Sequence, residues 1–140
     1  MVVQADQRDF KKSFTKHYHT YLHWPEQASD NSRQLILVYC VESGLKCFLM
    51  KTLHLSRVSD AQDKIIKILT SHDLESLLKE NHIGGHHFPL IKTIHGDVVP
   101  IKRFHELCRY CVPVAKDHLR LPELCENHLK AIASLLSERI

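Results

Sequence analysis

The chain has 140 residues, of which 44% are hydrophobic and 25% charged, and this ordinary balance excludes a disordered or fibrous protein. Its 19 basic and 16 acidic residues leave a formal charge of only +3, so charge permits a nucleic-acid partner without demanding one. At this length we expect one domain, covering residues 1–140.

The counts of histidine and cysteine are more informative than the charge. Twelve histidines could respond to pH or bind metal ions. Five cysteines are an odd number, and no signal-like apolar segment follows the start, so we expect reduced thiols in a cytoplasmic, intracellular compartment. No apolar run approaches the roughly 20 residues needed to span a bilayer, and we therefore expect a soluble protein with no membrane partner.

Residues 5–22 predict an N-terminal helix, because aromatic side chains recur there with a helical period along one stripe. The stripe consists of Phe10, Phe14, Tyr18 and Tyr21. Amphipathic helices normally bury such a face, so core packing is the expected role of these rings. On the same helix His19 and His23 form an i, i+4 pair that could chelate a metal ion.

Residues 35–53 predict a β-hairpin. A continuous apolar run from Leu35 to Val41 reads as a buried strand, Glu42-Ser43-Gly44 has the composition of a turn, and the apolar pattern then resumes. Cys40 and Cys47 fall inside these strands, where a free cysteine behaves as a small hydrophobic residue.

The remainder predicts two central helices, a second hairpin and a C-terminal pair of helices. The central helices begin near Ser59 and Asp73, residues of the type that caps a helix. The second hairpin covers about 88–104, and the last helix opens at Pro122. This order predicts an α+β fold in which both hairpins form one antiparallel sheet packed against the helices.

The sharpest motif lies in residues 104–140. Cys108-x-x-Cys111 is followed after thirteen residues by Cys125-x-x-His128, and two such pairs can meet at one tetrahedral zinc ion. The sequence therefore predicts a zinc centre and a metal-organised C-terminal subregion over residues 104–140. The alternative is that these residues fill apolar helix faces without any metal.

A second set of ligands competes for the same cysteines. His82, His86 and His87 flank a Gly-Gly pair, and His82-x-x-x-His86 followed by Cys108-x-x-Cys111 resembles the HHCC zinc domain of retroviral integrases over residues 82–111. The resemblance implies zinc bound by those two histidines and two cysteines.

The leading functional hypothesis is a non-catalytic, zinc-stabilised binding or regulatory module that recognises a protein partner or nucleic acid. One alternative is a metal-free dimeric chaperone or adaptor, because helix–sheet–helix order in a chain of this size resembles secretion chaperones. The other is a metal-dependent hydrolase or nuclease that uses the His82, His86 and His87 cluster, with His118 as base.

Overall fold

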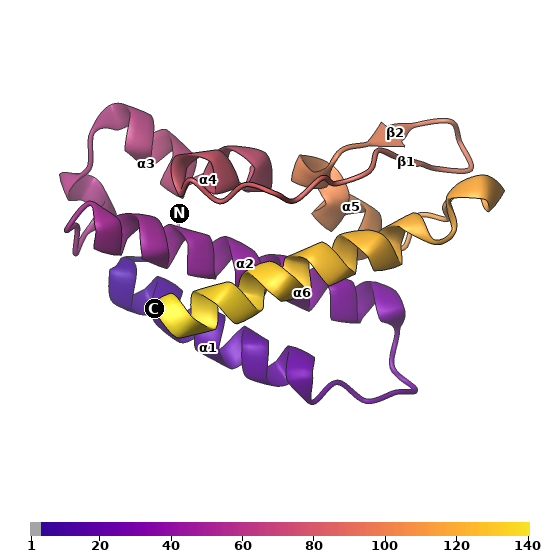
Figure 1. The fold of residues 1–140 in the computed structure, drawn as a ribbon, viewed down its shortest axis with the longest axis horizontal. Coiled ribbons are helices and arrows are strands. Elements are labelled where there is room, and N and C mark those ends of the chain that lie inside the picture. Colours follow the sequence, from indigo (N-terminus) through magenta and orange to yellow (C-terminus); the bar gives the residue numbers. More distant parts are fainter. Residues whose placement is uncertain (1–3) are drawn as a thin grey trace.

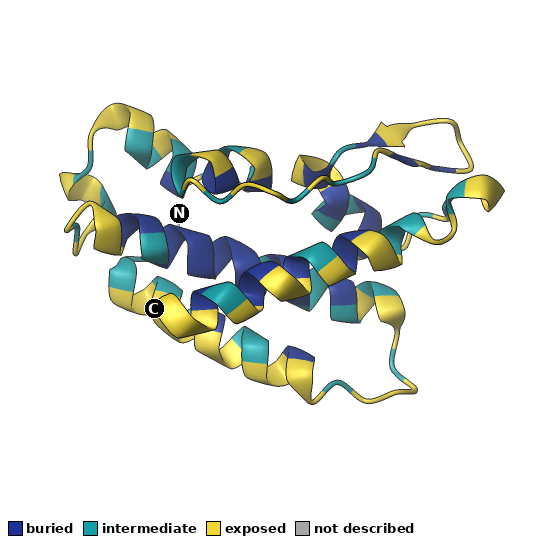
Figure 2. Ribbon diagram, in the orientation of Figure 1, coloured by how far each residue is buried: buried dark blue, intermediate teal, exposed yellow. Residues whose placement is uncertain are grey.

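One long buried helix organises the protein. The computed structural model describes residues 4–140, and in it α2 (Asp30–Thr52) runs through the middle of the molecule (Figure 1). Helices α1 (Gln7–Leu22) and α6 (Leu121–Arg139) pack against it, and so do the short helices α4 (Leu74–Glu80) and α5 (Phe104–Arg109). The buried side chains concentrate along α2 and on the faces of its neighbours (Figure 2).

The predicted hairpin over 35–53 is wrong, because residues 35–52 lie within the single helix α2 and Leu53 is its C-cap. The Ser29 side chain caps the helix by accepting a hydrogen bond from the Ser32 backbone N–H at 3.4 Å. Every residue from Cys40 to Cys47 is buried. A helix packed on all sides needs apolar residues in all directions, and such a run has no amphipathic period to distinguish it from a buried strand.

Gly44 is a point of close helix packing and not a turn residue. A Cβ atom built on it would lie 2.6 Å from Cδ1 of Phe14 in α1 and 2.9 Å from Cδ1 of Leu136 in α6. The absence of a side chain therefore lets three helices approach one another at this position.

The other elements are short. Helix α3 (Asp63–Leu69) follows a 3-10 turn at Val58–Asp60, and the Asp73 side chain caps α4 through the Ser76 backbone N–H at 3.2 Å. Further 3-10 turns cover Ile101–Arg103 and Lys116–His118. Within residues 4–140, no helix is both long enough and apolar enough to cross a bilayer.

The α+β fold class is wrong as well. Strands β1 (Ile91–Lys92) and β2 (Val98–Val99) have two residues each and pair antiparallel, with Ile91 opposite Val99. Because residues 35–52 are helical, this ribbon has no second hairpin to pair with in the described part of the chain. The protein is therefore mostly helical, with a small ribbon at one end.

Candidate functional site

The four predicted zinc ligands lie in different environments. Cys108 and Cys125 are buried, and the Cys108 thiol donates to Oε1 of Gln34 at 3.8 Å. Cys111 is exposed and has a left-handed φ of 50°. Across residues 4–140 no group of three or more His, Cys, Asp or Glu side chains is arranged to hold a metal ion. A zinc centre made by Cys108, Cys111, Cys125 and His128 stays a prediction.

Burial also affects the chemistry of the thiols. It raises the pKa of Cys108 and of Cys125 to about 12, with a further contribution for Cys108 from neighbouring acidic groups. Zinc is bound by thiolates, so binding at this position would have to remove protons from two groups that hold them strongly.

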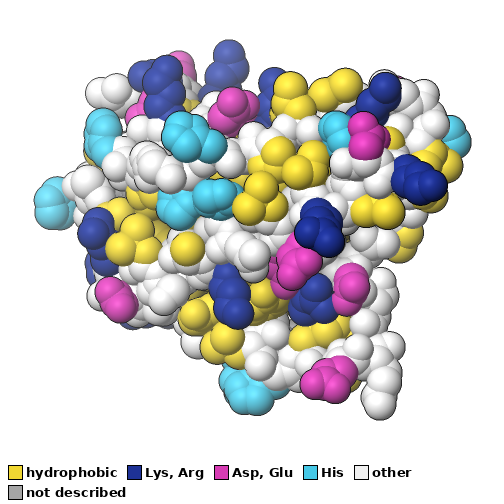
Figure 3. All heavy atoms as spheres, turned by 45° about the vertical axis from the view of Figure 1, so that its right-hand side comes forward, with side chains coloured by type: hydrophobic (Ala, Val, Ile, Leu, Met, Phe, Trp, Pro, Cys, Tyr) yellow, Lys and Arg dark blue, Asp and Glu magenta, His cyan; other side chains and the backbone are white. Residues whose placement is uncertain are grey.

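His128 contacts a histidine from the other predicted set. Its Nδ1 atom lies 3.0 Å from Nδ1 of His86, and the two rings meet edge to face at 87°. The Phe88 ring packs beside both imidazoles, with its centroid 5.4 Å from that of His128. Figure 3 shows several histidine side chains on one face of the molecule, some of them next to hydrophobic atoms. The structure thus joins one ligand from each of the two predicted sets.

The remaining predicted histidines do not join this pair through any hydrogen bond or ring contact among residues 4–140. His82 and His87 are exposed. His118, the predicted base, accepts a hydrogen bond at Nδ1 from the Lys92 backbone N–H at 2.9 Å and so anchors the segment before α6 to β1.

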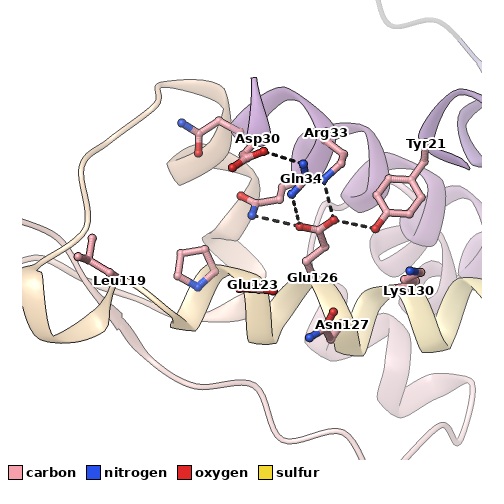
Figure 4. Close-up of a pocket in the computed structure, with 11 residues that line it drawn as sticks. Tyr21, Asp30, Arg33, Gln34, Leu119, Glu123, Glu126, Asn127 and Lys130 are labelled. Carbon is pink, nitrogen blue, oxygen red and sulfur yellow. Dashed lines mark hydrogen bonds and ion pairs between the residues drawn. The ribbon is translucent and has the colours of Figure 1, made fainter. Parts of the chain in front are cut away.

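Glu126 is the centre of a buried polar network (Figure 4). It accepts hydrogen bonds from the Tyr21 hydroxyl at 2.7 Å, from Nε and Nη2 of Arg33 at 2.8 and 2.9 Å, and from Nε2 of Gln34 at 3.3 Å. Arg33 also forms an ion pair with Asp30 at 2.6 Å. The network connects α1, α2 and α6 across one side of a hollow of about 540 Å³.

The charges in this network compensate one another. Burial by itself raises the pKa of Glu126, but hydrogen bonds from Arg33 and Tyr21 outweigh it and hold the pKa below its ordinary value. Because the carboxylate already accepts four hydrogen bonds, its lone pairs are engaged within the protein. We conclude that the network stabilises the helix packing and leaves little capacity for a ligand.

A second buried carboxylate, Glu42, has a different setting. Its Oε1 accepts a hydrogen bond from Nδ1 of His72 at 2.8 Å, and its Oε2 lies 3.6 Å from the Lys46 ammonium. The Lys46 nitrogen also lies 5.6 Å from the centre of the Phe10 ring. The His72 side chain is 62% exposed, and the His105 ring lies 5.7 Å away between centroids. A fixed carboxylate thus orients an imidazole at the surface.

This cluster adjoins a cavity of about 830 Å³. Its wall combines apolar side chains, among them Phe10, Ile66 and Leu69, with the cationic side chains of Lys46 and Arg57 and with His72. Burial lowers the pKa of Lys46, and the nearby Glu42 opposes that change. A buried ammonium and an oriented imidazole at the wall of a cavity are features typical of a ligand-binding site.

The sequence pattern does not reveal this cluster, because it predicts a turn at Glu42 and a strand at Lys46. The signal that could have found it is the Glu42-x-x-x-Lys46 spacing, which places the two side chains together only on a helix.

Compared with known proteins, the chain matches no protein-family model, no curated protein and no solved structure.

Proposed function

We propose that the protein is a binding module for single-stranded RNA, which places a nucleotide in the cavity beside Glu42, Lys46 and His72. The observation that carries the proposal is the Lys46 ammonium, which is buried at the wall of this cavity and lies next to the Phe10 ring. A phosphate brought to this position adds negative charge beside a cation that burial has deprived of water.

The shape and chemistry of the cavity support a nucleotide. Its volume of about 830 Å³ falls within the range of small-molecule sites, roughly 300–1,000 Å³. The apolar side chains offer a surface for a base, while Lys46 and Arg57 offer positive charge for a phosphate. An unstacked base of a single strand can enter such a hollow, whereas a base in a duplex cannot.

The test measures binding of a fluorescently labelled single-stranded RNA of about 12 nucleotides by polarisation. Lys46→Met should weaken binding at least tenfold, because it removes the buried charge and keeps most of the side-chain volume. Lys12→Met, which alters an exposed lysine of α1, is the matched control and should change affinity less than twofold.

A second variant separates binding from folding. Arg57 is exposed, so Arg57→Ala should leave thermal unfolding unchanged and still weaken RNA binding severalfold. Affinity should also fall with salt, by about 0.7 log units per log unit of salt for each phosphate contacted. Equal affinities of wild type, Lys46→Met and Arg57→Ala would refute the proposal.

Cleavage of the bound RNA is a second candidate function, favoured by the two adjacent imidazoles of His72 and His105. Burial lowers the pKa of His105, which suits it to accept the proton of a ribose 2′-hydroxyl near neutral pH. The 2′-oxygen then attacks the phosphorus and forms a cyclic phosphate. His72, held through Nδ1 by Glu42, gives a proton from Nε2 to the departing 5′-oxygen.

If this chemistry operates, the wild-type protein should cleave the RNA in the presence of a chelator and leave 2′,3′-cyclic phosphate ends. His72→Ala should then slow cleavage about a hundredfold while RNA binding changes far less. His95→Ala is the control, since His95 is exposed in the turn of the ribbon. Intact RNA after prolonged incubation with the wild type would restrict the function to binding.

A further inference from the structure

Two histidines distant in sequence lie against each other between α6 and the connection that leads from α4 to β1. Nδ1 of His86 and Nδ1 of His128 are 3.0 Å apart. A hydrogen bond between two Nδ1 atoms needs a proton on one ring and a lone pair on the other. At least one lone pair is therefore directed into the space between the two nitrogens.

This separation is close to that of two ligands on one metal ion. Zinc–imidazole bonds of about 2.0–2.1 Å place two nitrogens roughly 3.3 Å apart on a tetrahedral ion. Coordination widens the observed 3.0 Å gap by a few tenths of an ångström, and both rings must also turn so that their lone pairs converge on one point beside the line that joins the two nitrogens. The two Nδ1 atoms thus lie close enough for joint coordination, once the shared proton is lost and an ion binds beside the two nitrogens.

The surroundings of the pair favour binding. Both histidines are partly buried, and Phe88 packs beside both rings and restricts their orientation. A small hollow of about 290 Å³ adjoins His86 and is lined also by Glu75 and His87, so water can reach the His86 side of the pair.

From this geometry we infer that His86 and His128 form a site for an imidazole-preferring divalent first-row metal ion, zinc or copper, whose other coordination positions are filled by water. The ion connects α6 to the 81–90 connection. It stabilises the folded state because only folding brings the two rings together. This site uses two of the predicted ligands in a combination that neither predicted set contains, and it does not depend on the proposed RNA function.

The experiment follows thermal unfolding and copper coordination. Excess ZnCl₂ should raise the melting temperature of the wild type, and His86→Ala and His128→Ala should each lose most of that rise. In Cu²⁺ titrations followed by electron paramagnetic resonance, each variant should raise the dissociation constant at least tenfold and remove one nitrogen from the coordination sphere of this ion.

The chain offers a matched control in the exposed pair on α1, whose ring centroids are 4.2 Å apart. The double variant His19→Ala, His23→Ala should keep the zinc-dependent rise. His128→Gln retains hydrogen-bonding capacity and separates loss of metal binding from loss of folding. In the absence of added metal, this variant and the wild type should have the same melting temperature. Equal zinc-dependent rises in the wild type and both single variants would overturn the inference. Loss of the rise only in the α1 double variant would assign the metal to that pair.

Discussion

Replacing Glu126 with alanine is expected to lower the free energy of unfolding by about 3 kcal/mol. The change removes the acceptor of four hydrogen bonds and leaves the Arg33 charge and the Tyr21 hydroxyl without their partner. The loss lies at the lower end of the range for buried ion pairs because the Arg33 side chain is 28% exposed and water can partly replace the carboxylate. Urea denaturation of the two proteins measures the difference.

Glu123→Ala is the matched control, since Glu123 is an exposed glutamate on the same helix and should change stability by less than about 0.5 kcal/mol. A loss below about 1 kcal/mol for Glu126→Ala would show that the network contributes little. Glu126→Gln keeps most of the side-chain shape and removes the charge. Its loss of unfolding free energy should therefore lie between those of Glu126→Ala and Glu123→Ala.

The wild type and Glu126→Gln should also differ in how their free energy of unfolding depends on pH. The folded pKa of Glu126 lies below its unfolded value, so its contribution is present at neutral pH. That contribution is lost as the pH falls below the ordinary glutamate value of about 4.3 toward the lower folded pKa. Between pH 7 and pH 3.5 the wild type should therefore lose more stability than Glu126→Gln.

The second large effect is expected at Gly44. Gly44→Val should lower the free energy of unfolding by about 3 kcal/mol, because even a Cβ atom at this position would approach Phe14 to 2.6 Å and Leu136 to 2.9 Å. In an uncrowded helix the same kind of change is favourable, since glycine is a poor helix former. The sign of the effect therefore reports the close packing of α1, α2 and α6.

Gly84 provides the comparison for Gly44. A Cβ atom there would meet nothing within 4 Å, and its φ is not left-handed. Gly84→Val should thus change the free energy of unfolding by less than about 0.5 kcal/mol. Similar losses at both glycines would contradict the packing argument. A stabilising Gly44→Val would show that the three helices do not approach as closely as the structure indicates.

The sequence predicted some helices correctly from local patterns of hydrophobic and capping residues. The aromatic stripe over 5–22 predicts a helix, and the structure has α1 over Gln7–Leu22 with Phe14 and Tyr21 buried. Asp73 predicts the start of a helix, and its side chain caps α4. These predictions succeed because an amphipathic period and a capping side chain act within a few residues of the chain.

The central helix could not be predicted in this way. From Leu35 to Met50, most side chains are apolar, and buried residues lie on most sides of the helix. The segment therefore has no amphipathic period that would distinguish a helix from a strand. The neighbours on every side decide the outcome, as at Gly44, where α1 and α6 occupy the space that a side chain would need.

The candidate sites also depend partly on the sequence and partly on the tertiary structure. The sequence by itself determined which metal-binding and charged side chains the protein has: the histidines, the cysteines, and Glu42 and Glu126. Only the tertiary structure decided the combinations, since Glu42 meets His72 and His128 meets His86 rather than a cysteine. The physical reason is that spacing constrains partners within one helical turn, whereas partners 30 or 42 residues apart are selected by how whole helices pack.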